Sequence, residues 1–397
     1  MKKLSILSLI LLVIFNSGCG QVSKNLDVKD GNNSGYSTVT DEYAINNNLS
    51  ALAIRTTNEN TTLDVSGTSD IILKQISELA PPLYQDEVLQ ATDIEIKGKY
   101  VYISYNTQGE EKRGGVQILF YDGSKLQVIS EMVLFNADVH ALKVDEGGNV
   151  LYLAESVESD NPACLEILEL KQNQIVGSLG RVALPSYAAV DVDTIPQGGY
   201  VYVVYGDKNG GVAKIDKKTL KVENTYSADD IRSVNAKGDD LYILQGCPAV
   251  LKALDKHSLS LLWSKNYSGL NIPESKAVVD YISKVVVFSA GDAGSYIVNS
   301  DSGEELLHFL VPQGDINSGD AVCNSISFDG DLLFLANGSA GVEIVQLDRN
   351  MEAISSEVNI VSRGSLKTNS SVNMVAYDDK LLFVTAGWGG IKVIAIN

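Results

Sequence analysis

One pattern recurs seven times along this 397-residue chain, and it limits the possible fold more than any other feature. Each copy is a β-rich apolar run, a loop with glycine or polar residues, and a second apolar run, as in "YVYVVYGDKNGGVAKID" and "LLFVTAGWGGIKVIAIN". A period of 40 to 50 residues that contains only strand patterns is typical of β-propeller blades. The copies begin at Tyr100, Val150, Tyr200, Leu241, Val285, Leu332 and Leu381.

Each unit extends to four strands. An alternating strand such as "ATDIEIKG" precedes the first run, and an outer strand such as "KLQVISEMVLF" follows the second. The seventh unit has only three strands, and the spare strand "IILKQISEL" (Ile71–Leu79) lies before the first unit. We therefore predict an all-β, seven-bladed β-propeller domain over residues 49–397, with four-stranded antiparallel blades and a last blade closed by this N-terminal strand.

Other architectures fit the repeat less well. A β-sandwich rarely repeats one unit seven times, and the coils of a β-solenoid are much shorter than this unit. Six or eight blades remain alternatives to seven. The stretch Ser50–Gly67 could add an extra strand or hairpin to the closing blade, and the sequence leaves this open.

The N-terminal stretch "MKKLSILSLILLVIFNSGCG" has two lysines, an apolar run and small residues before Cys19. It predicts a secretory signal over residues 1–18 that resembles those of bacterial lipoproteins, in which the cysteine is acylated, although Asn16 departs from the usual aliphatic residue. The rival, an uncleaved anchor, is disfavoured because about 12 apolar residues are too few to span a bilayer. Residues 19–48 are rich in Asn, Ser, Asp and Gly and predict a flexible tether. We expect an exported protein, lipid-anchored through Cys19 to a bacterial membrane, on the periplasmic side or at the cell surface.

The formal net charge is −19, from 31 Lys+Arg and 50 Asp+Glu, and no basic block is present. This composition argues against a nucleic-acid partner, because phosphates require a cationic surface. Three further cysteines, Cys164, Cys247 and Cys323, contain no C-x-x-C pair, and their odd number leaves at least one unpaired. We expect each to be a small buried residue, with a Cys164–Cys247 bridge as the alternative.

The motifs "ATDIEIKGKYVYISY" with "GGVQIL" and "GWGGIKVIAI" resemble the LVIVD-repeat propellers. The match is good in units 1, 6 and 7, partial in units 2 and 3, and poor in units 4 and 5. That family is found mostly in exported bacterial proteins and is defined by its fold. The resemblance therefore implies an architecture and brings no catalytic residues with it.

Catalytic and metal-binding motifs are scarce. The three histidines, His140, His257 and His308, are expected at positions that do not converge, and no zinc, calcium or phosphate-loop motif occurs, so we expect no cofactor and no metal. An acid pair at the channel mouth, as in propeller glycosidases and lyases, is the catalytic alternative. Its candidates are Asp93, Asp138, Asp229, Asp230, Asp315 and Asp320, although aspartates are also common in turns.

A binding surface is predicted at the mouth where the innermost strands begin. Aligning the units places seven residues at equivalent positions there: Thr92, His140, Ala188, Arg232, Ala277, Asn324 and Asn373. Trp388, Tyr105, Tyr187 and Tyr205 are aromatic residues on the same side, and Trp388 could stack on a sugar or a partner side chain. The ligand-binding candidates are Thr92, His140, Arg232, Asn324, Asn373, Trp388 and Tyr205. Solvation of the channel by the polar residues, and packing of Trp388 against the next blade, are the structural alternatives.

These observations favour a non-catalytic binding module with an unidentified glycan or envelope protein as its partner. A carbohydrate-active enzyme that uses an acid pair at the mouth is the alternative. A scaffold subunit that binds other proteins through its blade edges is a third possibility, which an exposed apolar patch on the rim would favour.

Overall fold

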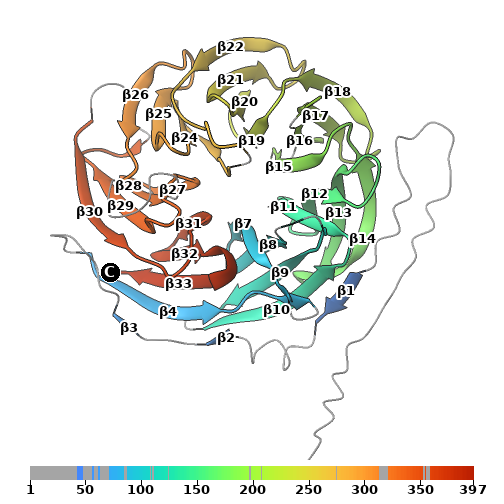
Figure 1. Cartoon of the computed structure of the whole chain (residues 1–397), viewed down its shortest axis with the longest axis horizontal. Helices are drawn as coiled ribbons and strands as arrows, with labels where there is room; N and C mark the ends of the chain where they lie inside the picture. Colours follow the sequence, from blue (N-terminus) through green and yellow to red (C-terminus); the bar gives the residue numbers. More distant parts are fainter. Residues whose placement is uncertain are drawn as a thin grey trace, which may run out of the picture.

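The computed structural model describes residues 43–47, 56–57, 61–62, 71–84, 87–107, 109, 111–123, 125–195, 198–206, 208–273, 275–312, 321–351, 354 and 358–397. Seven antiparallel sheets stand around a central channel like the blades of a propeller (Figure 1), each with four main strands. The predicted seven-bladed all-β architecture is confirmed. Among these residues, no helix is both long and apolar enough to cross a bilayer.

Each blade begins with its innermost strand and ends with its outermost strand, and consecutive strands pair as hairpins. Blade 1 contains β7 (Gln90–Lys97), β8 (Tyr100–Asn106), β9 (Gly114–Tyr121) and β10 (Leu126–Leu134). Blade 2 contains β11 (Ala137–Val144), β12 (Val150–Val157), β13 (Ala163–Lys171) and β14 (Gln174–Ala183). Blade 3 contains β15 (Ala188–Thr194), β16 (Tyr200–Gly206), β17 (Gly211–Asp216) and β18 (Val222–Ser227).

The next three blades have shorter strands. Blade 4 contains β19 (Ile231–Asn235), β20 (Asp240–Gln245), β21 (Val250–Asp255) and β22 (Leu261–Asn266). Blade 5 contains β23 (Val279–Ile282), β24 (Val285–Ser289), β25 (Ser295–Asn299) and β26 (Glu305–Phe309). Blade 6 contains β27 (Ser325–Asp329), β28 (Leu332–Ala336), β29 (Val342–Leu347) and β30 (Ile360–Leu366).

Blade 7 is assembled from both ends of the sequence. It contains β31 (Met374–Asp378), β32 (Leu381–Thr385), β33 (Ile391–Ile396) and, as its fourth strand, β4 (Leu73–Leu79). β4 pairs antiparallel with β33, from Leu73 opposite Ile396 to Leu79 opposite Ile391. Ile72 and Asn397 extend the pairing by two backbone hydrogen bonds, of 2.9 and 3.0 Å. The predicted closure by the N-terminal strand is confirmed, and it removes what would otherwise be an open sheet edge.

Three short N-terminal strands pair with the outermost strands of blades 7 and 1. β2 (Thr56–Thr57) and β3 (Thr61–Thr62) both pair with β4, so part of the stretch that the sequence left open does extend the closing blade. β1 (Tyr43–Asn46) pairs with β10 at the outer edge of blade 1. The C-terminal end of the predicted tether therefore belongs to the propeller domain. Asn47 adds side-chain hydrogen bonds to Ser130 and to the Ile175 carbonyl, at 2.7 and 3.2 Å.

The core consists of seven apolar clusters, one between each pair of neighbouring blades. The middle strands of a blade are buried on both faces, as in β24, whose five residues are all buried. This is why they read as continuous apolar runs rather than as alternating patterns. Each fully buried Leu or Ile contributes about 2 kcal/mol of hydrophobic stabilisation, so the blade interfaces carry most of the stability.

Candidate binding face

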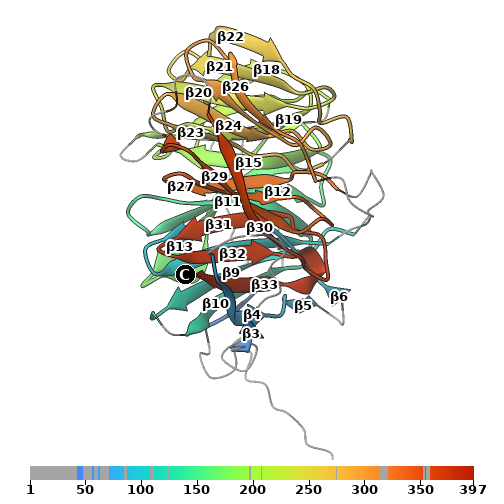
Figure 2. The same cartoon turned by 90° about the vertical axis from the view of Figure 1, so that its left-hand side faces the viewer.

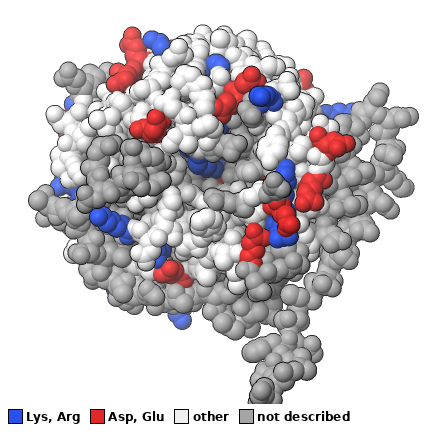
Figure 3. Space-filling model, in the orientation of Figure 1, with Lys and Arg blue, Asp and Glu red and all other residues white. Residues whose placement is uncertain are grey.

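The two faces of the ring differ in which connections they carry. The face toward the viewer in Figure 1, called here the front face, carries the links between blades and the loops between second and third strands. The link from β4 to β7 contains the hairpin β5–β6 (Leu83–Tyr84, Glu87–Val88), which lies on the right in Figure 2. The hairpins between first and second strands lie on the opposite, back face. In Figure 3 the front face has a central hollow with Lys or Arg atoms inside it.

The innermost strands of blades 1 to 4 share a bulge near the front face. In each, the pairing with the second strand shifts by one residue at the same point. The skipped residues are Thr92, His140, Val190 and Arg232. A bulge re-aims the side chain of its extra residue. Three of these were predicted as mouth residues, but the alignment in blade 3 was wrong by two positions, because Val190 and not Ala188 is the equivalent residue.

Several of the predicted ligand residues bond to the next blade instead of standing free. Thr92 donates to the Val139 carbonyl at 2.8 Å, and Asn373 donates to the Ala91 carbonyl at 3.0 Å. Asn324, which is 6% exposed, donates to the Val372 carbonyl at 2.9 Å. Thr92 therefore links blade 1 to blade 2, Asn324 links blade 6 to blade 7, and Asn373 links blade 7 to blade 1. Ala277 is 2% exposed and packs in the apolar cluster between blades 4 and 5.

A second set of polar side chains, of which the sequence singled out only Asp93, as a candidate acid, continues these links. The channel-side edge of each innermost strand has no strand beside it, so its N–H groups need other partners. Asp93 accepts from the N–H of Leu142, and Asp191 accepts from that of Val234. Ser233 and Ser325 do the same for blades 5 and 7, accepting from the N–H groups of Val279 and Val375.

Further from the front face, the same innermost strands form ion pairs that join three blades. Lys143 of β11 forms ion pairs of 3.1 Å with both Glu95 of β7 and Asp193 of β15. Burial alone would lower the pKa of Lys143, but the two carboxylates outweigh it and raise the pKa well above its usual value. The lysine therefore stays charged. The sequence signal was present as polar residues at alternate positions in "DIE", "LKV" and "DVD", with apolar residues between them.

Arg232 is also a structural residue. Its guanidinium makes two bonds of 2.9 Å to the carboxylate of Asp230 and donates to the hydroxyl of Ser275 at 2.6 Å and the carbonyl of Ile272 at 3.1 Å. It is 7% exposed. The arginine thus fixes the link between blades 4 and 5.

His140 lies at the channel wall beside Ser156, with 3.1 Å between the imidazole Nε2 and the hydroxyl. Lys276, just before β23, donates to the His140 carbonyl at 3.2 Å. This bond crosses the channel, because blades 2 and 5 are not neighbours. Burial, reinforced by the cations Lys276 and Lys112, lowers the pKa of His140 to about 4. The imidazole is therefore neutral at neutral pH.

The candidate acids are held by structural hydrogen bonds. Asp138 accepts from the N–H groups of Thr107 and Arg113, at 3.3 and 3.1 Å, and burial raises its pKa to about 6. Asp229 accepts from Gly210, and Asp230 pairs with Arg232. Asp315 and Asp320 lie outside the described residues. Burial also raises the pKa of Asp191 to about 6; Lys276 opposes this rise, and Asp93 adds to it.

The aromatic residues divide into buried and exposed groups. Tyr105 and Tyr205 are 0% and 3% exposed and lie within the blade interfaces. Trp388, by contrast, is 56% exposed, within a short 3-10 helix η2 (Gly387–Gly389) that connects β32 and β33. Tyr187, in the link from blade 2 to blade 3, is 64% exposed, and the Lys112 amine lies 4.7 Å from its ring centroid. Trp388 therefore keeps more than half of its surface exposed, although η2 contacts β7 of the next blade.

Charge is also buried away from the channel, in the middle of blade 2. Arg181 contacts both Glu155 and Glu166, and the two glutamates are 0% and 2% exposed. Burial, together with the charge of Glu166, raises the pKa of Glu155 well above its usual value, and burial raises that of Glu166 to about 7. Burial therefore favours the protonated form of Glu155, and Arg181 forms ion pairs with both glutamates.

The three cysteines with described structure are free thiols, and no disulfide forms between Cys164 and Cys247. Cys164 and Cys323 are buried as expected, whereas Cys247 is exposed. No group of three or more His, Cys, Asp or Glu residues arranged to hold a metal ion occurs in the part of the chain that the structure covers.

Comparison with known proteins supports the fold. No protein-family model matches the chain, and no curated protein matches it. The crystal structure of the RRP9 WD40 repeats is similar, with a TM-score of 0.60 and 10% identity over 84% of this chain and 100% of that one. The structure of U3-55K gives a TM-score of 0.59 and 10% identity over 80% and 97%. At this identity the likeness shows the β-propeller fold alone, and the likeness to LVIVD-repeat propellers remains a resemblance of motifs.

Proposed function

We propose that this chain is a binding module of the LVIVD-repeat type, anchored to a bacterial envelope by lipid at Cys19, that recognises a glycan or an envelope protein through its front face. One observation carries the proposal. Trp388 and Tyr187 project from that face into solvent, whereas the polar residues around the channel bond to neighbouring blades. Exposed rings offer a large contact area at a small entropic cost, so they are suited to stacking on a sugar or a partner side chain.

The catalytic alternative has less support. Asp93, Asp138, Asp229 and Asp230 each accept structural hydrogen bonds, so an acid–base role would compete with the fold. The pKa of about 6 for Asp138 and Asp191 is the one feature that suits a general acid. Any glycan that binds should therefore also be examined for turnover, with Asp138→Asn and Asp191→Asn variants to identify the acid.

Binding is tested with a soluble chain of residues 41–397, which retains β1, on glycan arrays and against solubilised envelope proteins. We expect saturable binding that Trp388→Ala and Tyr187→Ala each weaken. Leu262→Ala is the matched control, since Leu262 is 51% exposed on the outer edge of blade 4. Loss of binding in the control but not in the front-face variants would instead favour a scaffold that binds through blade edges.

The anchor is tested in the full-length chain. We expect the protein in the membrane fraction, a diacylglyceryl mass increment on the N-terminal peptide, and release to the soluble fraction on Cys19→Ser. An unmodified cysteine with unchanged fractionation would contradict lipidation without affecting the binding proposal.

A further inference from the structure

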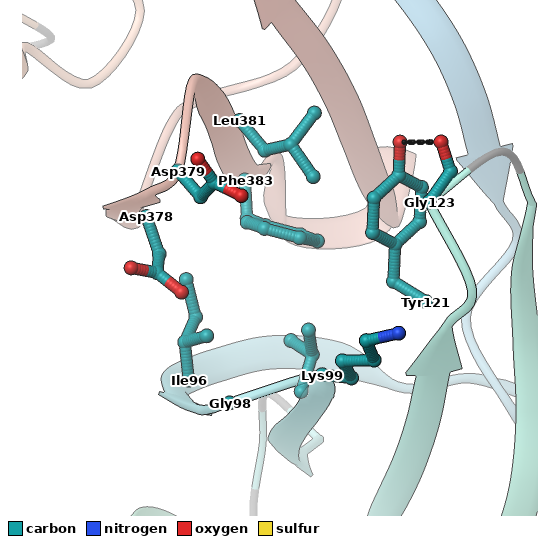
Figure 4. Close-up of a pocket in the computed structure, with 10 residues that line it drawn as sticks. Ile96, Gly98, Lys99, Tyr121, Gly123, Asp378, Asp379, Leu381 and Phe383 are labelled. Carbon is teal, nitrogen blue, oxygen red and sulfur yellow. Dashed lines mark hydrogen bonds between the residues drawn. The ribbon is translucent and has the colours of Figure 1, made fainter.

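A pocket of about 120 Å³ opens on the back face, at the contact between blades 7 and 1, and the front-face proposal does not involve it (Figure 4). Its walls come from three connections: the hairpin β7–β8, the loop β9–β10 and the hairpin β31–β32. They are lined by Ile96, Gly98, Lys99, Val101, Tyr121, Gly123, Asp378, Asp379, Leu381 and Phe383.

The floor of the pocket is apolar and firmly held. Val101, Leu381 and Phe383 are 1%, 9% and 2% exposed and belong to the cluster that joins blades 7 and 1. Tyr121 forms a side wall, and its hydroxyl donates to the Gly123 carbonyl at 2.9 Å, as Figure 4 shows. The Tyr121 ring is thereby held at the side of the pocket, above the apolar floor that includes Phe383.

The rim carries charge of mainly one sign. Asp378 and Asp379 stand on the side of the hairpin β31–β32, and Lys99 stands across the pocket from them. Asp379 and Lys380 have φ values of +43° and +67°, as a type I′ turn requires, so the backbone holds Asp379 in place. Burial, with the carboxylates of Asp122 and Asp379, raises the pKa of Tyr121.

We propose that this pocket receives an arginine side chain of a partner protein. A guanidinium is planar, stacks on aromatic rings and pairs with carboxylates, so the floor and rim together match it better than they match an ammonium or an anion. A cavity of about 150 Å³ holds the six carbon atoms of benzene, so a pocket of about 120 Å³ has room for the four heavy atoms of a guanidinium. The net charge of −19 also favours a cationic partner.

Lys99 makes it possible to distinguish a cation site from an anion site by experiment. It lies in the pocket wall opposite the two aspartates, so it repels a cation and attracts an anion. Removing its charge should therefore strengthen binding of the proposed ligand and weaken binding of any anionic one. Removing either aspartate should do the reverse.

The probe is N-acetyl-arginine amide, which has no terminal charges, titrated into the soluble chain and followed by saturation-transfer NMR. We expect a dissociation constant on the order of 1–10 mM, as is reasonable for one side chain. Asp379→Asn should raise it about threefold or more, and Lys99→Gln should lower it about twofold. Asp301→Asn is the matched control, since it removes an exposed aspartate from another back-face loop.

The outcomes separate the possibilities. N-acetyl-lysine amide should bind more weakly than the arginine probe, and N-acetyl-glutamate amide should not bind. Binding of the arginine probe that Asp301→Asn weakens as much as Asp379→Asn does would reduce the effect to general surface charge and overturn the proposal. Loss of binding in Lys99→Gln would also overturn it, since it would indicate an anion site. Trp388→Ala should leave the result unchanged, so failure here is distinguishable from failure of the front-face proposal.

Discussion

The channel ring and the rim of the front face are only a short distance apart, yet they use their side chains differently. In the ring, here Thr92, Lys143, Asn324 and Asn373 with their partners, polar groups bond to the backbone or the charges of the next blade. On the rim, Trp388 projects into solvent. The contrast teaches that polarity near a propeller mouth is a poor guide to ligand binding, because the open edges of the innermost strands require polar partners of their own.

The largest effect that would test this contrast is expected in the ring. Lys143→Ala leaves Glu95 and Asp193 without their shared cation, and removing one partner of a buried ion pair is strongly destabilising. We expect a loss of about 3 kcal/mol in the free energy of unfolding, measured by urea denaturation. Lys265→Ala, on the exposed outer strand β22, is the control and should change stability by less than about 0.5 kcal/mol. Equal stability of the two variants would contradict a structural role for the ring.

A smaller loss is expected from a neutral ring residue. Asn373→Ala removes the hydrogen bond to the Ala91 carbonyl, which joins blade 7 to blade 1, and should cost about 1.5 kcal/mol. Ligand binding measured below the unfolding transition should stay within about twofold of the unmodified chain. A large loss of affinity with unchanged stability would return Asn373 to the set of ligand-binding residues.

Trp388, on the rim of the front face, should show the opposite pattern, with an effect on binding and almost none on stability. Trp388→Ala should weaken binding of any ligand found in the screen by about tenfold, equivalent to about 1.4 kcal/mol. The thermal unfolding midpoint should remain within about 1 °C, because the indole contributes little to the core at 56% exposure. Calorimetric titration and thermal denaturation of the same sample give both values, and a marked fall in the midpoint would show that Trp388 is a packing residue.

The smallest effect is expected for Glu155, which is buried in blade 2, outside both regions. The pKa of Glu155 is higher in the folded chain than in the unfolded chain, so the folded state binds more protons and stability falls as pH rises above about 4.5. Glu155→Gln cannot lose a proton. Its unfolding midpoint should match that of the unmodified chain at pH 5 and exceed it by roughly 2 °C at pH 9. A pH-independent difference would mean that Glu155 is ionised throughout.

Some of the site could be read from the sequence and some could not. The exposed positions of Trp388 and Tyr187 follow from their place in front-face loops, which the repeat locates. The role of Arg232 was not predictable, because its partners Asp230, Ile272 and Ser275 come from two links whose approach depends on the ring. The offset of two positions in blade 3 was not visible in the sequence, since the bulged residue Val190 is apolar whereas those of blades 1, 2 and 4 are polar.

The sequence by itself determined the number of blades, the four-strand unit and the closure of blade 7 by Leu73–Leu79, because these depend on local alternation and on counting strands. Only the tertiary structure decided which polar side chains remain available to a ligand. That availability depends on contacts between residues 47 positions apart, as between Thr92 and Val139, or 282 positions apart, as between Asn373 and Ala91. Local sequence patterns do not indicate these contacts, because the contacts form only when the ring closes.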